Sequence, residues 1–92
     1  MNAETAQTIA LQALGWLVGN DALCPVFLGA TGGSMEDLRS RAGDVEFQAA
    51  VLDFITMDDS WVIEFCDSVS LSYEQPMRAR QSLPGAEQIH WT

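Results

Sequence analysis

The chain has 92 residues, of which 48% are apolar, and it carries thirteen acidic side chains against four arginines and no lysine. The net charge of −9 repels phosphate backbones and anionic membrane surfaces, which excludes nucleic-acid and membrane binding and favours a basic protein partner. The length suits one domain, residues 1–92, and no apolar run reaches the roughly 18 residues of a membrane-spanning helix. We expect a cytosolic protein, because the first basic residue is Arg39 and the N-terminus does not resemble a signal peptide.

The first predicted helix covers residues 3–18 and presents one broad apolar face. Gly19 and Asn20 end it, and Asp21 is of the type that accepts hydrogen bonds from the free amides of the next helix. The residues expected on the buried face are Ala6, Ile9, Ala10, Ala13, Leu14, Trp16 and Leu17.

The second predicted helix, residues 22–30, contains no polar side chain. Pro25 falls in its first turn, where a missing amide costs little. A small domain cannot bury every side of such a helix, so we expect the face with Cys24 and Leu28 to be exposed and to contact a partner or a second copy. The alternative is burial of this helix under the C-terminal tail, with Trp91 as its cover.

Four further helices are predicted over residues 35–42, 45–57, 60–69 and 73–83. The residues expected to cap their N-termini are Ser34, Asp44, Asp59 and Ser72. The helix at 45–57 is apolar around most of its circumference, which places it at the centre of the fold. Strand periodicity is absent, and residues 86–92 are expected to form a flexible tail. The predicted fold is an all-α, compact bundle of five or six short helices.

The residue patterns of common catalytic and metal sites are not met. The glycine-rich stretch at 29–34 lacks a lysine for a phosphate, and the single histidine, His90, lies in the predicted tail. Cys24 and Cys66 are too few for a disulfide framework and too far from His90 for a zinc site, so we expect buried free thiols. We predict no catalytic residue, no metal and no cofactor.

Four acidic side chains on two predicted helices have no cation in helical register. Glu46 and Asp53 lie seven residues apart on one face of the central helix, and Glu64 and Asp67 lie on the outer face of the next. They form either a solvated face that keeps the protein soluble or a docking patch for a basic partner. A rival hypothesis is an enzyme or small-ligand carrier that uses Glu46 and Asp53 as an acid–base pair.

The four arginines form two Arg-x-Arg pairs, on the third and sixth predicted helices. Residues two apart point in different directions on a helix, so neither pair forms a clamp and both are expected on solvated faces. Acidic residues three or four positions earlier predict the surface ion pairs Glu36–Arg39, Asp37–Arg41 and Glu74–Arg78.

Two stretches resemble a known family. The run Asp-Leu-Arg-Ser-Arg-Ala-Gly-Asp-Val-Glu-Phe-Gln-Ala-Ala-Val-Leu-Asp-Phe at residues 37–54, and Arg-Ala-Arg-x-x-Leu-Pro-Gly at residues 78–85, are similar to the signature of a small alphaproteobacterial family of unknown function. The resemblance covers nearly the whole chain and implies a small, single-domain helical protein of the bacterial cytosol. It carries no site residue.

Unpaired charge and surplus apolar surface together favour a non-catalytic module that binds another protein. A homodimer through the second helix is the first alternative, and the enzyme or ligand carrier is the second. The residues expected to contact a partner are Glu46, Asp53, Glu64 and Asp67 on the acidic faces, and Cys24 and Leu28 on the apolar face.

Overall fold

The computed structural model describes residues 1–83, and over this range the chain forms six α-helices and no strand, which confirms the predicted all-α fold. The tail predicted at residues 86–92, with Trp91 and His90, lies outside the described residues. The helices are α1 (Ala3–Val18), α2 (Cys24–Thr31), α3 (Met35–Ser40), α4 (Val45–Ile55), α5 (Asp59–Val69) and α6 (Gln75–Ser82).

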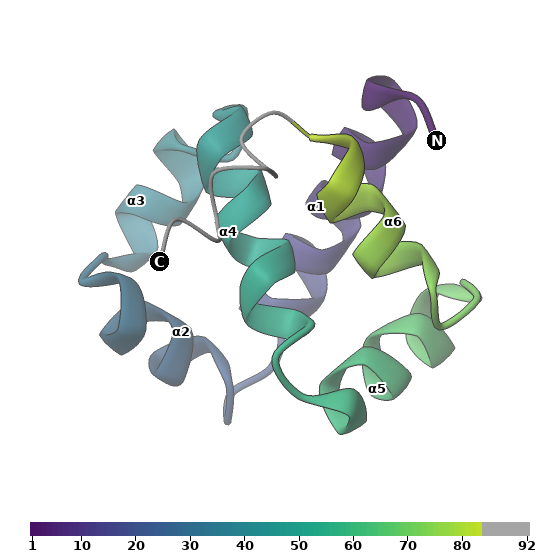
Figure 1. Cartoon of the computed structure of the whole chain (residues 1–92). Coiled ribbons are helices and arrows are strands. Elements are labelled where there is room, and N and C mark those ends of the chain that lie inside the picture. The colour runs from purple at the N-terminus through teal and green to yellow at the C-terminus, as the bar shows by residue number, and fades with distance from the viewer. Residues whose placement is uncertain (84–92) are drawn as a thin grey trace, which may run out of the picture.

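The helices are arranged around α1 and α4, which pack against each other in the middle of the molecule (Figure 1). Helix α6 packs against both of them, and α5 packs against α1. Helices α2 and α3 lie on the side of α1 and α4 that is opposite to α5 and α6 (Figure 1), and they approach their neighbours less closely. The chain therefore has a closely packed part, α1, α4 and α6, and a more loosely attached pair, α2 and α3.

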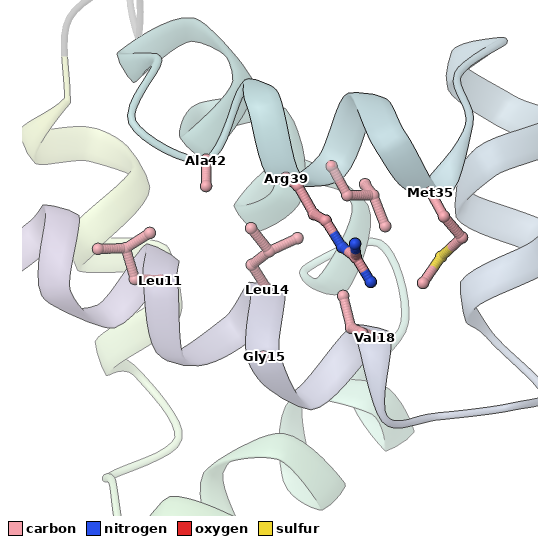
Figure 2. A pocket seen from close by; sticks show the side chains of 8 residues that line it. Leu11, Leu14, Gly15, Val18, Met35, Arg39 and Ala42 are labelled. Carbon is pink, nitrogen blue, oxygen red and sulfur yellow. The ribbon is translucent and has the colours of Figure 1, made fainter.

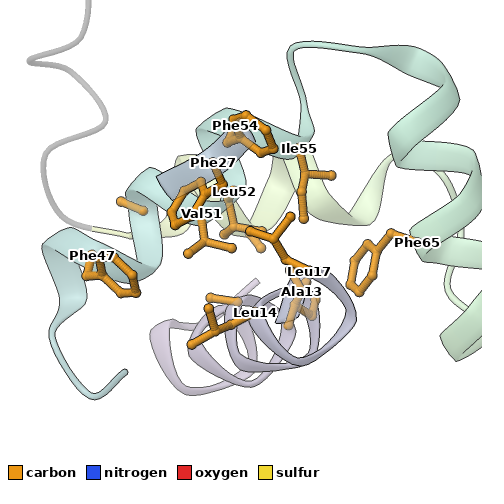
Figure 3. Close-up of a cluster of buried hydrophobic side chains, with 14 of the residues drawn as sticks. Ala13, Leu14, Leu17, Phe27, Phe47, Val51, Leu52, Phe54, Ile55 and Phe65 are labelled. Atoms are coloured by element: carbon orange, nitrogen blue, oxygen red, sulfur yellow. The ribbon is translucent and has the colours of Figure 1, made fainter. Parts of the chain in front are cut away.

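The hydrophobic core lies mainly between α1 and α4, as their facing side chains in Figure 3 show. Phe27 of α2 enters it and meets Phe47 and Phe54 edge-on, with ring centroids 5.9 and 5.2 Å apart. Phe65 brings α5 to the same core, 5.9 Å from the ring of Trp16. Each fully buried side chain of this size contributes about 1.5–3 kcal/mol, so these aromatic contacts hold the outer helices to the centre.

The predicted core faces are confirmed. The apolar face of α1 is buried as expected except at Trp16, which is only partly covered. Helix α4 buries side chains around most of its circumference, and α5 buries Phe65 and Cys66 while Glu64 and Asp67 remain exposed. The spacing of apolar residues was thus sufficient to predict which side of each helix faces the core.

Two of the predicted N-terminal caps are confirmed. The Ser34 hydroxyl accepts a hydrogen bond from the Asp37 amide at 3.3 Å, while the Asp37 carboxylate accepts one from the Ser34 amide at 2.9 Å. This reciprocal capping box starts α3. Asp44 caps α4 through the Glu46 amide at 2.9 Å. Gly32 ends α2 in the left-handed conformation, with φ of 73°, where a side chain would be strained.

Three predicted caps are wrong. The Asn20 side chain, instead of Asp21, accepts hydrogen bonds from the amides that precede α2, and Asp58, instead of Asp59, caps α5. Each pair places two capping residues side by side, and composition alone does not distinguish them. Residues after Ser72 form a turn, so α6 begins only at Gln75 without a side-chain cap.

Two predicted helices also end early. The helix expected over 35–42 ends at Ser40, and the helix expected over 45–57 ends at Ile55. At the second end the Thr56 hydroxyl donates to the Asp53 carbonyl at 3.2 Å, and this bond satisfies a carbonyl that the Met57 amide would have reached in a longer helix.

Candidate functional site

An apolar groove runs between α1 and α3 and opens to solvent, with a volume of about 340 Å³ (Figure 2). Helix α1 contributes residues at positions i, i+3, i+4 and i+7, the spacing of a single helix face, and α3 contributes positions i, i+3 and i+4. We call this surface the α1–α3 groove; its lining residues are Leu11, Leu14, Gly15 and Val18 from α1, and Met35, Leu38, Arg39 and Ala42 from α3 and the turn that follows it.

The lining of the groove divides into a buried base and an exposed border. Leu14 and Leu38 are buried and belong to the core. Leu11, Val18 and Met35 are 46%, 39% and 43% exposed. Three large apolar side chains thus remain exposed around one hollow, where a bound partner could cover them.

Gly15 lies in the middle of the α1 side of the groove (Figure 2). A Cβ atom added to Gly15 would meet no neighbouring atom within 4 Å, so nothing in the described fold requires glycine there. Glycine inside a helix costs about 0.5–1 kcal/mol relative to alanine. The groove is thus deepened by a residue that weakens its own helix.

A second hollow, of about 250 Å³, continues the groove toward α2 and shares Val18 and Met35 with it. Cys24 and Leu28 line this hollow together with Asp21 and Pro25. The Cys24 thiol donates to the Met35 sulfur at 3.6 Å and so links α2 to α3.

We expected the face of α2 with Cys24 and Leu28 to be exposed, and the structure corrects this expectation. Cys24 is buried and Leu28 is partly buried, whereas Pro25 and Val26 are exposed. The start of α2 turns Cys24 toward Met35, so its apolar surplus is covered in part by α3.

Asp53 has no cation in helical register, but the expectation that its charge is unpaired is wrong, because α6 supplies a cation. The Asp53 carboxylate accepts a hydrogen bond from Arg80 Nε at 2.7 Å. Arg80 is only 6% exposed, so the prediction of a solvated face for this arginine is also wrong. The two residues are 27 positions apart, and only the packing of α4 against α6 brings them together.

The other acidic candidates are exposed. Glu46 and Glu64 lie at the surface of α4 and α5. Asp67 accepts a hydrogen bond from the Tyr73 hydroxyl at 2.8 Å, and this bond, with the carboxylate charge, raises the pKa of Tyr73. None of these side chains lines the α1–α3 groove or the adjoining hollow.

The ion pairs expected for the arginines in and after α3 also differ from the prediction. Arg41 pairs with Asp44 at 3.7 Å and lies over the Phe47 ring, 5.0 Å from its centre. Asp37, expected to pair with Arg41, instead completes the capping box of α3. The three predicted ion pairs do not form among the described residues.

Cys24 and Cys66 are both buried free thiols, as predicted. Burial raises the pKa of Cys66, whose thiol donates to the Ser72 carbonyl at 3.5 Å. Between residues 1 and 83, no three histidine, cysteine or acidic side chains gather where they could share a metal ion. Over that same stretch no helix has the length and apolarity to cross a membrane.

The family model described as "Protein of unknown function (DUF3572)" matches residues 3–86. The chain belongs to this family. Neither the comparison with curated proteins nor the comparison with solved structures gives a match. The resemblance to an uncharacterised family is thereby confirmed, while an alphaproteobacterial source stays a prediction. The DUF3572 description assigns no activity, so family membership identifies no functional residue in this chain.

Sequence reasoning missed the α1–α3 groove, although part of its signal was visible. Leu11 and Val18 lie two helical turns apart and off the main apolar face of α1, which indicates a second, narrower apolar line. Gly15 lies between them and has no side chain that would add to this apolar line. The sequence pattern could not show that the lining residues of α3 face Leu11 and Val18, nor that an open groove remains between the two helices.

Proposed function

We propose that this chain is a non-catalytic interaction module that binds a helical segment of another protein in the α1–α3 groove. One observation supports this proposal above all. The apolar side chains of α1 and α3 face each other across an open hollow, and Gly15 lies in its middle. An amphipathic helix laid into a groove between two helices is a common mode of peptide recognition. It would bury Leu11, Val18 and Met35, which are otherwise exposed.

The chemistry of the groove supports binding over catalysis. Among residues 1–83, Arg39 is the one ionisable side chain that lines the groove, and the adjoining hollow adds Asp21 and the Cys24 thiol. A general acid–base reaction needs titratable groups within reach of one substrate atom. Glu46 and Asp53, the pair considered for that role, line neither space, and Asp53 is engaged with Arg80.

Charge favours a different protein as the partner over a second copy. Two chains that each carry a net charge of −9 repel each other on approach. The α2 surface considered for a homodimer is partly covered, because Cys24 is buried and Leu28 packs against the core. We place the module in the bacterial cytosol, as the sequence resemblance implies.

The proposal is tested by filling the groove. Gly15→Leu places a side chain in open space inside a helix, so it should fold normally and block the groove. Gly29→Leu is the matched control, since Gly29 is also helical and open but lies outside both hollows. We expect affinity capture to recover a partner with the unmodified chain and Gly29→Leu, and at least about tenfold less with Gly15→Leu.

Two results would contradict the proposal. Equal recovery with all three chains would place the contact elsewhere, for example on Glu46 and Glu64. A dimer in light scattering that Gly15→Leu converts to a monomer would show that a second copy occupies the groove. Thermal unfolding of each variant verifies that lost recovery does not reflect lost folding.

A further inference from the structure

We infer that the occupant of the α1–α3 groove is a basic amphipathic helix whose apolar face carries a large side chain over Gly15. This inference rests on the proposed function and specifies the chemistry of the partner. It follows from three features of the groove: its length and shape, the position of Gly15, and the charges near it.

The shape of the groove fits a helix. From Leu11 to Val18 its α1 side spans two helical turns, about 10 Å. Both sides are helix faces, and within residues 1–83 there is no sheet edge to which an extended peptide could add as a strand. A partner helix with apolar residues at i, i+3, i+4 and i+7 would meet both sides along this length.

Gly15 sets how closely that helix can approach. Leu11 and Val18 border the groove on either side of it, one turn away in each direction (Figure 2). With no side chain at position 15, the space between them reaches the backbone of α1. One large apolar residue of the partner therefore fits between Leu11 and Val18.

Within residues 1–83, no acidic residue lines the α1–α3 groove, but exposed acidic residues follow its two helices beyond the lining and one lines the adjoining hollow. Glu4 lies seven residues before Leu11, on the same face of α1, and is exposed. Glu36 adjoins Met35 in the first turn of α3 and is exposed, and Asp21 lines the adjoining hollow. Basic side chains flanking the apolar face of a partner helix would meet these carboxylates.

Few cations oppose this charge pattern. Arg80 is buried against Asp53 and Arg41 pairs with Asp44, so two of the four arginines are already engaged with carboxylates. Arg39 remains within the groove, and its aliphatic part covers apolar surface there. The whole chain carries a net charge of −9, and this negative charge attracts a basic segment and speeds its encounter.

Three synthetic helical peptides test the inference. They share one apolar face, with leucine at i, i+3, i+4 and i+7, and carry lysine, glutamine or glutamate on the opposite face. Binding of each labelled peptide is measured by fluorescence anisotropy at low salt and at about 0.3 M NaCl. We expect the lysine peptide to bind at least about tenfold more tightly than the glutamine peptide, and to lose most of that advantage in salt.

Two pairs of variants distinguish the contribution of the apolar groove to peptide binding from the contribution of the nearby acidic residues. Gly15→Leu should abolish binding of the lysine peptide, whereas Gly29→Leu should retain it. The double change Glu4→Gln and Glu36→Gln should weaken binding several-fold, whereas Glu46→Gln and Glu64→Gln, a change of equal charge away from the groove, should not.

The outcomes distinguish the inference from the proposed function. One outcome is that the lysine and glutamine peptides bind equally well and that Gly15→Leu abolishes the binding of both. In that case the groove is the docking site, and the inference that its partner is basic is refuted. If Gly15→Leu leaves peptide binding intact, the groove itself is refuted. If none of the three peptides binds, the inference fails, and the capture experiment with Gly15→Leu decides the proposed function independently.

Discussion

Asp53 and Arg80 show how a single pair of residues ties two helices together. Arg80 is buried, and its Nε donates to the Asp53 carboxylate, which is 43% exposed. The Nη1 atom of Arg80 is also buried and has no hydrogen-bond partner among residues 1–83. A buried guanidinium with one strong contact depends heavily on that contact, because an unpaired buried charge is costly.

Removing the Asp53 charge should therefore destabilise the fold. We expect Asp53→Asn to lower the free energy of unfolding by about 1.5–3 kcal/mol, the range for a hydrogen bond to a charged group, because the half-exposed carboxylate is partly screened by water. Urea unfolding measures this change. Arg80→Met, and the double variant, complete a cycle that isolates the pair.

The control for this prediction is Glu46→Gln, seven residues earlier on α4, which should stay within about 0.5 kcal/mol of the unmodified chain. An Asp53→Asn effect no larger than that of the control would show that the ion pair does not hold α6 to α4.

Tyr73 provides a pH-dependent measure of the contact with Asp67. Its hydroxyl donates to the carboxylate, and the negative charge opposes ionisation, so the pKa of Tyr73 lies above its usual 10.0. This raised pKa stabilises the fold below about pH 10, and the contribution is lost as the pH rises through the folded-state pKa. In Asp67→Asn we expect the pKa of Tyr73 to fall toward 10.0.

Tyrosinate absorbance measures this shift directly, because Tyr73 is the single tyrosine of the chain. Glu64→Gln removes a neighbouring charge on α5 without touching the hydrogen bond and serves as the control. An unchanged pKa in Asp67→Asn would mean that the two side chains do not interact in solution.

At the scale of helices, sequence patterns predicted much of what the structure shows. Apolar spacing gave the six helices and their buried faces, because burial follows the helical period directly. The capping residues at two helix starts were predicted wrongly, because Asn20 and Asp21, like Asp58 and Asp59, are neighbours with similar capping ability. Asp53 and Arg80 were beyond prediction because no local spacing relates α4 to α6.

Two glycines at helix positions should respond in opposite ways to the same substitution. Gly15→Ala should raise the free energy of unfolding by about 0.5–1 kcal/mol, because Gly15 is helical and has open space around it. Gly32→Ala should lower it by about 1–2 kcal/mol, because the φ of 73° at the end of α2 is strained for a side chain.

Urea unfolding of both variants, with an unchanged dependence on urea, tests the two signs together. A destabilising Gly15→Ala would show that the helix at Gly15 is distorted or already crowded, and it would remove the physical basis for the deep groove.

At the scale of the whole molecule, charge opposes the fold while it keeps the protein dispersed. The chain carries thirteen acidic side chains, and the radius of gyration of 12.2 Å is comparable to the screening length of about 10 Å, so repulsion between carboxylates acts across the molecule. The ion pairs found between residues 1 and 83 offset only part of this repulsion. The net charge of −9 therefore lowers the stability of the compact state.

Salt should relieve this repulsion. We expect the midpoint of urea unfolding to rise between low salt and about 0.5 M NaCl, where screening shortens to a few ångströms. The double variant Glu46→Gln and Glu64→Gln, with two fewer charges, should show a smaller rise. A midpoint that falls with salt would show that attraction between charges outweighs repulsion.

The looser attachment of α2 and α3 gives the two sides of the groove different freedom to move. Its α1 side belongs to the closely packed part of the fold, whereas its α3 side belongs to the pair that approaches its neighbours less closely. Local opening of α2 and α3 would widen the groove while α1, α4 and α6 stay folded. Backbone amides of α3 should then exchange hydrogen with water well before those of α1, and an occupant of the groove should slow that exchange selectively.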